Sequence, residues 1–468
     1  MAKTGRAMLA ELLIPSDRLD VSAAGALRIE GHEAAALLER FGSPLNVVVE
    51  STLRENYRRI RRAFAERWPA PVNVMYAIKT NNTLAIRAVL SEEGAGGDCF
   101  GLGELHATMV GGADPARVVM NGSNKSRAEI AAAVRLGITL NIDGEAEIAI
   151  AQAEARAAGR TARVALRLKL MPEGLDSFSP VFFKTTGGIR DAVRRSKWGY
   201  SPEAATPLLR AIAAAPDLRF AGYSCHVGRF AADPRAYGVV ARAIGEAVLA
   251  LHAATGLWPE ILDIGGGWAR QREPESRAPD LNPHAIEDHA AASVAGLLDA
   301  LRPTGRALPA LWLEPGRYVV GNAVVLLARV GAIKRDCGLT WVHVDASTND
   351  LMRIETSQAW YHVLPASRMD ADDVGPVEIV GGTCIPSLIG AGREMPGLAA
   401  GDCVAILDAG MYAEAIANQF NAIPRPACVL VAPGRAEIVK RRETIADLFA
   451  THVVPERLAG ATRQGIDV

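Results

Sequence analysis

The sequence has no surplus of basic charge and no long apolar run, and each absence excludes a class of protein. Its 468 residues contain 51 Lys and Arg against 52 Asp and Glu, a formal net charge of −1. This balance argues against a general nucleic-acid binder, although it leaves room for a local pocket for one phosphate. No run of about 18 apolar residues occurs, so we expect no membrane-spanning helix and no membrane partner. The apolar stretch at residues 7–15 is interrupted by Glu11, which is not the pattern of a signal peptide.

Cysteine is also scarce, with six residues that are widely separated and show no C-x-x-C spacing. They are too sparse for a disulfide framework, and their spacing is wrong for zinc. The histidines show no metal-ligand spacing either. We therefore expect no metal site, and a reducing cytoplasm as the compartment. Five cysteines lie in or beside apolar, strand-like runs and are predicted to be buried small residues: Cys99, Cys225, Cys337, Cys403 and Cys428.

Short β-branched, apolar runs alternate with Ala-rich helical segments such as residues 204–216 and 285–303. This alternation is typical of parallel βα units. The eight runs are Val72–Lys79, Gly97–Phe100, Arg117–Gly122, Ile138–Asp143, Arg163–Lys169, Phe220–Gly228, Ile261–Gly266 and Ala310–Gly316. From Lys79 to Glu314 is roughly 235 residues, close to the ~250 of a (β/α)8 TIM-type barrel. Strand counting alone leaves a doubly wound open sheet as the alternative.

The pattern changes after about residue 325, where valine-rich runs are separated by Gly, Pro and Asp. This indicates a β-rich domain with hairpin-like turns. The runs are Val324–Val330, Trp341–Asp345, Pro376–Val380, Asp402–Leu407 and Ala427–Val431. The stretch Leu27–Asn46 precedes the first barrel strand and is assigned to the same domain. We divide the chain into a barrel at 45–325 and a β-rich domain formed by 1–44 and 326–468. Met171–Ser196 is predicted to be a long functional or mobile loop.

Several predicted strands end in residues that carry chemistry, at the edge where (β/α)8 barrels hold their active sites. Strand one ends at Lys79, and a lysine in a buried strand is costly unless it is paired or used covalently. Lys79 is therefore either a rim lysine that extends to solvent or a Schiff-base lysine with a lowered pKa. The later strand ends carry Asp98 with Glu104, then His226, then Gly265, Gly266 and Gly267, and finally Glu314 with Arg317.

Each of these strand ends is weak evidence alone, because a glycine run marks many turns and a lone histidine is often a core residue. Their convergence on one rim is more informative. Loops after strands seven and eight commonly hold a phosphate, and glycine N–H groups can approach an anion closely because no Cβ intervenes. The set suits pyridoxal 5'-phosphate, with an aldehyde for Lys79, a phosphate for Gly265–Gly267 and a ring nitrogen for Glu314.

From about Gly42 to Phe449 the sequence resembles the fold-type III pyridoxal-phosphate decarboxylases. These are the diaminopimelate and ornithine/arginine decarboxylases, with alanine racemase as a more distant relative. The resemblance implies a (β/α)8 barrel plus a β-rich C-terminal domain, and a homodimer in which each active site borrows residues from the other subunit. The matching segments are Tyr76–Asn81, Asn121–Ser126, Ser196–Gly199, His226–Gly228, Leu262–Gly267, Glu314–Arg317, Val344–Ala346, Asn349–Arg353, Asp408–Tyr412 and Arg441–Thr444.

The resemblance also implies a role for each matching residue. Lys79 would carry the cofactor as an internal aldimine, His226 would stack on the pyridine face, and Glu314 would hold the ring nitrogen. Cys384, offered by the second subunit, would protonate the quinonoid carbon after carbon dioxide leaves the external aldimine. The phosphate would be held by Gly265, Gly266, Gly267, Arg317 and Tyr412. Asp98 and Glu104 would support the lysine and the ring, and the substrate would contact Arg317, Arg353 and Tyr412.

Three positions depart from the family pattern. The family places an acidic residue after its cysteine, and in the diaminopimelate enzymes that residue reads the distal amine; here it is Ile385. A family tyrosine is replaced by Ser357, and a phosphate-binding serine by Arg229, which either contacts an anion or points to solvent. We therefore expect an amino-acid decarboxylase whose substrate is not standard meso-diaminopimelate. Pro386 weakly suggests an acylated or carrier-linked small-molecule substrate.

Two other functions remain open at this stage. A racemase or epimerase on the same cofactor would need a second base at Cα, and Cys384 could supply it. A non-catalytic relative would bind the cofactor without turnover. Against the second alternative, the sequence retains Lys79, His226, Glu314, Arg317, Cys384 and Tyr412 together.

Overall fold

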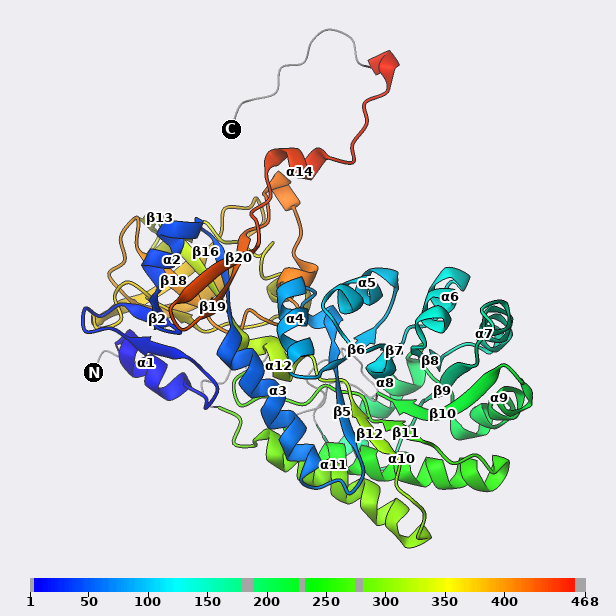
Figure 1. Ribbon diagram of the computed structural model, residues 1–468. Coiled ribbons are helices and arrows are strands. Elements are labelled where there is room, and N and C mark those ends of the chain that lie inside the picture. Colours follow the sequence, from blue (N-terminus) through cyan, green and yellow to red (C-terminus); the bar gives the residue numbers. More distant parts are fainter. Residues whose placement is uncertain (1–3, 179–187, 227–231, 274–280, 459–468) are drawn as a thin grey trace.

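The computed structural model describes residues 4–178, 188–226, 232–273 and 281–458. Figure 1 shows a barrel surrounded by helices beside a smaller β-rich domain, with α14 (Ile445–Phe449) projecting away from both. Helix α3 (Glu50–Ala65) links the two parts, because it contacts strands of the barrel and of the second sheet. Arg229 and part of the loop predicted at 171–196 lie outside the described residues.

Eight parallel strands form a closed barrel in the order β10-β11-β12-β5-β6-β7-β8-β9. Closure comes from β12, which pairs with β5 through Leu311 opposite Val72 and Leu313 opposite Val74. This pairing shows that the sheet is a closed barrel and not an open sheet. All eight predicted runs are strands of it. They are β5 (Val72–Ala77), β6 (Gly96–Cys99), β7 (Val118–Met120), β8 (Thr139–Ile142), β9 (Ala162–Leu168), β10 (Leu218–Cys225), β11 (Ile261–Asp263) and β12 (Ala310–Leu313).

Helices cover the outside of the barrel, and several begin at side-chain caps that the sequence supplies. Ser126 and Glu129 form a capping box at the start of α6, and the side chains of Ser201 and Asp233 cap α9 and α10. The helices of this part are α3, α4 (Leu84–Glu92), α5 (Leu102–Val110), α6 (Arg127–Leu136), α7 (Glu145–Ala157), α8 (Gly188–Arg195), α9 (Pro202–Ala214), α10 (Pro234–Thr255), α11 (Ile286–Leu301) and α12 (Arg317–Val320). Helix α8 and the 3-10 helix η3 (Leu175–Ser177) lie within the stretch predicted to be a loop.

The interior of the barrel is filled by side chains. Met75, Val119, Ala221, Ile261 and Trp312 form one buried cluster there, all at most 5% exposed. Layers of bulky side chains from different strands are the usual filling of such barrels. The barrel is therefore a packed core, and its chemistry is confined to the rim.

Helix α10 is, by length and composition alone, apolar enough to cross a membrane. In this fold it packs along α11 and α9 on the outside of the barrel. Long core helices of globular proteins pass the same test, so this is weak evidence for a membrane. The expectation that the protein has no membrane partner stays a prediction.

The second domain is built on a nine-stranded sheet, whose main path is β17-β16-β14-β13-β4-β19-β20. All five predicted valine-rich runs are strands of it. Strand β4 pairs with β13 and β19, so residues 45–49 belong to this sheet by pairing rather than to the barrel, where we placed them. The strands are β4 (Leu45–Val49), β13 (Val324–Asp336), β14 (Leu339–Val344), β15 (Val363–Leu364), β16 (Asp373–Val380), β17 (Leu388–Pro396), β18 (Cys403–Ile406), β19 (Ala427–Ala432) and β20 (Arg435–Lys440).

The N-terminal segment packs on this second sheet. Leu27, Ile29 and Leu38 share a buried cluster with Leu327 and Val429 of the sheet strands. The segment contains a small sheet and two helices: α1 (Gly5–Leu12), β1 (Leu19–Val21), β2 (Leu27–Ile29), β3 (His32–Glu33) and α2 (Ala34–Phe41). The remaining short helix of the domain is α13 (Arg353–Ser357).

One cysteine prediction is wrong. Cys337 is exposed, because it occupies the tip of the hairpin between β13 and β14 with a φ of 48°. A turn at a hairpin tip points into solvent, and apolar neighbours in the sequence do not change that. The four other cysteines predicted to be buried are buried: Cys99, Cys225, Cys403 and Cys428.

Candidate active site

Lys79 lies at the rim of the barrel, on the 3-10 helix η1 (Ile78–Thr80) that directly follows β5. Its ammonium group forms an ion pair with Asp98, at the end of the neighbouring strand β6. The same ammonium sits 4.7 Å from the centroid of the Phe100 ring, a cation–π contact. The carboxylate of Asp98 is fully buried, whereas 33% of the Lys79 side chain is exposed. The Lys79 side chain is therefore partly open to solvent.

The pKa of Lys79 differs from the expectation. A Schiff-base lysine was predicted to have a lowered pKa, and burial does act in that direction. The carboxylates of Asp98 and Glu314 outweigh this effect and raise the pKa above its ordinary value of 10.5. In the cofactor-free chain the amine is therefore charged at neutral pH.

A buried amide links the two acids that surround Lys79. The side-chain amide of Asn121, just after β7, donates to Asp98 at 2.7 Å and to Glu314 at 2.5 Å. Asn141 on β8 donates in turn to the carbonyl oxygen of the Asn121 side chain at 2.5 Å. Sequence reasoning did not assign either asparagine to the site. Their position at the ends of strands three and four was the available signal.

Glu314, just after β12, and Asp263, at the end of β11, form a pair of buried carboxyl groups. Burial, together with the charge of Asp98, raises the pKa of Glu314 to about 7. Burial and the charge of Glu314 also raise the pKa of Asp263 well above its ordinary value. Two acids this close cannot both be charged at low cost, so the pair holds a proton near neutral pH. Asp263 was not among the predicted site residues, although it stands directly before the glycine run.

The glycine run after β11 makes contacts that only glycine allows. A Cβ on Gly266 would lie 2.0 Å from the backbone oxygen of Glu314, and one on Gly265 would lie 2.5 Å from Nδ1 of His226. The N–H of Gly266 donates to that Nδ1 atom at 3.0 Å, which joins the loop to the end of β10. Gly267 has a φ of 101°, a conformation that favours glycine. His226 is thus in direct contact with Gly265 and Gly266, and its predicted stacking on a cofactor ring stays a prediction.

Tyr412 and Arg353 of the second domain, with Arg317 of the barrel, complete the rim. The N–H of Tyr412 donates to the Thr80 carbonyl at 2.8 Å, which places it beside the lysine segment. The guanidinium of Arg353, at the start of α13, lies 5.9 Å from the Tyr412 ring centroid. Arg317 begins α12, and its Nη1 lies 3.3 Å from a carboxylate oxygen of Glu273.

Two further predicted site residues lie outside this immediate set. Glu104, in the first turn of α5, accepts a hydrogen bond from the N–H of Phe100 at 2.7 Å, and burial raises its pKa. Its contact with Lys79 is indirect, through Phe100. Cys384 is exposed between β16 and β17, where its N–H donates to the Asn421 side chain at 2.9 Å. The contacts described for Cys384 thus lie within the second domain.

The arrangement fits pyridoxal phosphate on three counts. A lysine with a partly exposed side chain lies beside buried acids, and its amine is the group that would hold an aldehyde covalently. Gly265 and Gly266 leave no room for a Cβ, so at these positions the loop presents only backbone to the rim, as glycine loops that hold a phosphate do. Glu314 is a carboxyl group that shares a proton near neutral pH, the type of partner that a pyridine nitrogen requires.

Comparisons with known proteins agree with this fit. The family model of the pyridoxal-binding domain of pyridoxal-dependent decarboxylases matches residues 50–321, and that of their C-terminal sheet domain matches 317–410. The diaminopimelate decarboxylase of Methanothermobacter thermautotrophicus is 33% identical over 449 residues, which covers 94% of this chain and 98% of that one. That of Neisseria meningitidis is 33% identical over 421 residues, or 89% of this chain and 96% of the relative.

A solved structure shows the same architecture. The diaminopimelate decarboxylase of Methanocaldococcus jannaschii has a TM-score of 0.86 and 30% identity over 95% of this chain and 100% of that one. A second structure of that enzyme, in complex with L-lysine, has a TM-score of 0.85. These relatives are decarboxylases, which argues for the first of the three functions considered above and against a racemase or a non-catalytic relative. The chain belongs to the pyridoxal-phosphate-dependent decarboxylase family and is a carboxy-lyase that acts on an amino acid.

Proposed function

We propose that Lys79 holds the cofactor and that the enzyme decarboxylates an amino acid, free or acylated or carrier-linked, other than standard meso-diaminopimelate. The observation that supports the cofactor part is the continuous polar chain from Lys79 through Asp98 and Asn121 to Glu314. It places an amine and a proton-holding acid in one buried network. The substrate part rests on the sequence around Cys384 and Arg353.

The residues of the network have separate tasks in this proposal. When bound, the cofactor supplies a ring that accepts the electron pair released as carbon dioxide leaves the α-carbon. Glu314, with the proton it shares with Asp263, keeps a hydrogen bond on the ring nitrogen. Asp98 orients the amine of Lys79 and stabilises its charge between turnovers. The protein thus contributes orientation and electrostatics, and the cofactor contributes the chemistry.

The rim residues hold the two ends of the ligand. His226 would lie against the ring, and the loop Gly265–Gly267, with Arg317 and Tyr412, would hold the phosphate. Arg317, Arg353 and Tyr412 are also the residues that would meet the substrate. Cys384 would donate the proton that replaces the lost carboxyl group, in the active site of a second subunit.

Two substitutions support a changed distal substrate site. Ile385 follows Cys384 where the resembling enzymes place an acid, and an alkyl side chain cannot pair with a distal ammonium. Ser357 replaces the family tyrosine, and its hydroxyl donates to the Arg353 carbonyl at 3.1 Å within α13. A hydroxyl committed to its own helix is a poor reader of a distant carboxylate.

The opposite consideration is that the relatives compared above are named diaminopimelate decarboxylases, so meso-diaminopimelate is the rival substrate. The deciding experiment is a panel of amino acids and their acylated derivatives, with meso-diaminopimelate included. Carbon dioxide release and deuterium exchange at Cα are measured together. The proposal predicts release from a substrate without a distal ammonium, at a kcat/KM above that for meso-diaminopimelate.

Higher kcat/KM for meso-diaminopimelate than for every other panel member would overturn the substrate part. Deuterium exchange without carbon dioxide release would overturn the reaction itself. Lys79→Ala is the matched control, because it removes the attachment point and should abolish both signals. If purified wild-type protein binds no pyridoxal phosphate, the assignment of Lys79 is wrong.

A further inference from the structure

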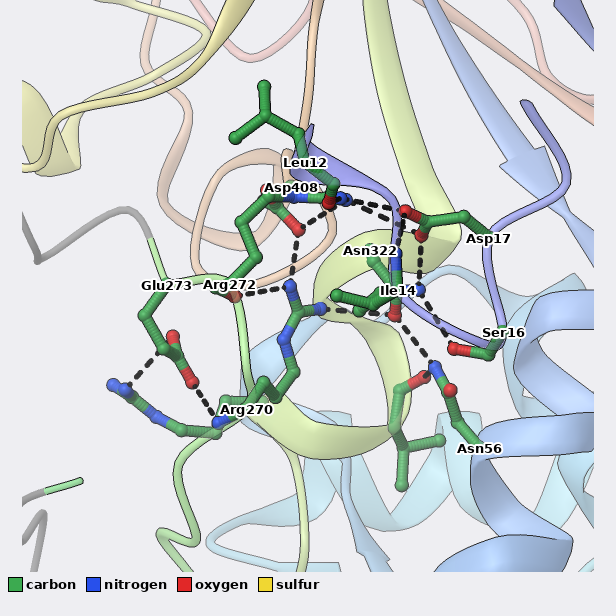
Figure 2. Close-up of polar contacts among 12 residues, drawn as sticks. Leu12, Ile14, Ser16, Asp17, Asn56, Arg270, Arg272, Glu273, Asn322 and Asp408 are labelled. Atoms are coloured by element: carbon green, nitrogen blue, oxygen red, sulfur yellow. Dashed lines mark hydrogen bonds and ion pairs between the residues drawn. The ribbon is translucent and has the colours of Figure 1, made fainter. Parts of the chain in front are cut away.

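Two arginines that follow the glycine loop lie in a buried polar network between the two domains (Figure 2). Nε of Arg272 donates to Asp408 at 2.6 Å, and Nη1 of Arg272 donates to Asp17 at 2.7 Å and to the Leu12 carbonyl at 2.5 Å. Arg270 forms an ion pair with the same Asp408. Three segments far apart in the sequence therefore meet at one guanidinium group.

The charged groups of the network are buried, and their charges balance. The side chains of Arg270, Arg272 and Asp408 are 2% exposed, and that of Asp17 is 1% exposed. Two positive and two negative groups face each other, and the amide of Asn322 donates to Asp17 at 2.7 Å. Buried ion pairs contribute little net stability, and in some proteins they fix a specific geometry.

Two glycines beside the network allow the backbone to approach it closely. A Cβ on Gly321 would lie 2.0 Å from Nη1 of Arg270, and one on Gly410 would lie 1.7 Å from the Val320 carbonyl oxygen. Gly410 stands between Asp408 and Tyr412 in the same loop. A side chain at Gly321 or Gly410 would therefore displace the arginine or the neighbouring backbone.

Two of the three segments carry residues proposed for the cofactor site, and the N-terminal segment carries none. The loop with Arg272 begins at Gly265–Gly267, and the loop with Asp408 continues to Tyr412. Glu273 extends the network to Arg317, since its carboxylate accepts from Arg317 at 3.3 Å and from the N–H of Arg270 at 2.9 Å. A shift of Arg272 against Asp408 would move these groups relative to one another.

We propose that Arg272 and Asp408 are positioning residues for the phosphate end of the cofactor. Asp17 pairs with the same guanidinium group, on the side of the N-terminal segment. The Arg272–Asp408 ion pair fixes the positions of the glycine loop, Arg317 and Tyr412 relative to one another, so that the phosphate site is formed before the cofactor binds. This inference rests on the proposed role of Gly265–Gly267, Arg317 and Tyr412. It adds the N-terminal segment to the parts of the chain on which cofactor affinity depends.

The test is the equilibrium binding of pyridoxal phosphate to cofactor-stripped protein, followed by the visible absorption of the Lys79-bound cofactor. Asp408→Asn keeps the shape of the side chain and removes its charge. It should raise the Kd for the cofactor about tenfold or more, a typical effect of removing a group that supports a binding site. Asp17→Asn leaves the Arg272–Asp408 pair in place and should raise the Kd less, in the same direction.

Two controls separate positioning from general loss of stability. Val429→Ala, in the fully buried core of β19, should lower the melting temperature without changing the Kd. Asp370→Asn removes a carboxylate of the same domain from an exposed ion pair with Arg6 and should change neither quantity much. Circular dichroism at the assay temperature confirms that each variant is folded.

Unchanged Kd values in the folded Asp408→Asn and Asp17→Asn variants would overturn the inference, even if their melting temperatures fall. If Asp408→Asn does not fold, the Kd of Asp17→Asn decides alone. Failure of the wild-type protein to bind the cofactor is a different result, because it contradicts the proposed function and not the network.

Discussion

At the scale of single residues, the charge on Lys79 is the property that the site controls most strongly. The surrounding carboxylates raise the pKa of Lys79, so the amine is protonated at neutral pH, yet only the neutral amine can attack an aldehyde. The neutral fraction grows about tenfold per pH unit below the pKa. We therefore expect the rate at which stripped protein reloads pyridoxal phosphate to rise steadily from pH 6 to pH 9, as measured by stopped-flow absorption.

Asp98→Asn provides the matched variant for this pH profile. It keeps a side chain of the same size beside the amine but removes the nearest negative charge. The pKa of Lys79 should fall, so reloading should be faster than in wild type at the same low pH. A reloading rate that does not change with pH would contradict the role of the ion pair. So would an Asp98→Asn variant whose reloading rate has the same pH dependence as that of the wild type.

Gly266 gives a second residue-scale prediction. In Gly266→Ala the new methyl group would meet the Glu314 backbone oxygen at 2.0 Å, so the loop must move away from the strand end. We expect a large loss of cofactor affinity, measured as above. Gly103→Ala is the control, because nothing lies within 4 Å of its Cβ and the site is inside α5. There alanine should stabilise the helix by no more than about 1 kcal/mol, because the position is in the first turn, and leave cofactor binding unchanged.

The residues that were predictable from the sequence share one property, which is that they end strands. Lys79, His226 and Glu314 follow apolar runs, and parallel strands bring such positions to one rim. The site residues that were missed need side-chain geometry instead. Nothing in the sequence says that Asn121 would bridge Asp98 and Glu314, or that the lysine would be more basic than usual rather than less.

At the scale of elements, the pair α10 and α11 covers one side of the barrel and contains a histidine whose ring nitrogens form no hydrogen bond within the part of the chain that the structure describes. His289 on α11 is fully buried and packs edge-on against Tyr237 of α10, with ring centroids 5.1 Å apart. Burial lowers the pKa of His289 to about 4. The hydroxyl of Tyr237 donates to the Gly267 carbonyl at 2.8 Å, so this helix pair also touches the glycine loop.

Protonation of His289 should therefore destabilise this helix pair in acid. Between the pKa of about 6.5 in the unfolded chain and about 4 in the native one, only the unfolded state binds the proton. Stability should thus fall as the pH is lowered from about 6.5 to about 4, by at most on the order of 3 kcal/mol. Urea unfolding at several pH values should show that His289→Phe removes this part of the pH dependence. His106 is exposed, and His106→Phe should leave the pH dependence of stability unchanged. An unchanged pH dependence in His289→Phe would refute the assignment.

Element prediction from the sequence was limited by long-range pairing. The eight barrel strands were found because each is followed by a helix in a regular alternation. The strand β4 was placed in the wrong unit, because its partners β13 and β19 lie hundreds of residues later and leave no local trace. Cys337 was misplaced for a related reason, since only the pairing of β13 with β14 shows that it occupies a turn.

At the scale of the whole molecule, the residues proposed to hold the cofactor come from both domains, and the proposed proton donor lies apart from them. Lys79, Glu314 and Tyr412 are joined by contacts within one chain, whereas Cys384 is exposed and bonded only to its own domain in the contacts described for it. This is the arrangement expected if Cys384 serves the active site of a second copy. A symmetric pair of chains would then hold two shared sites.

Subunit mixing tests this arrangement directly. Lys79→Ala and Cys384→Ala should each be inactive in forming the decarboxylated product. When the two are unfolded together, refolded and allowed to pair at random, half of the dimers contain both chains, and each of these has one intact site. About a quarter of wild-type activity should therefore return. If Cys384 acts within its own chain, no mixed dimer has an intact site. Activity would then stay absent even when gel filtration and mass spectrometry show that mixed dimers have formed.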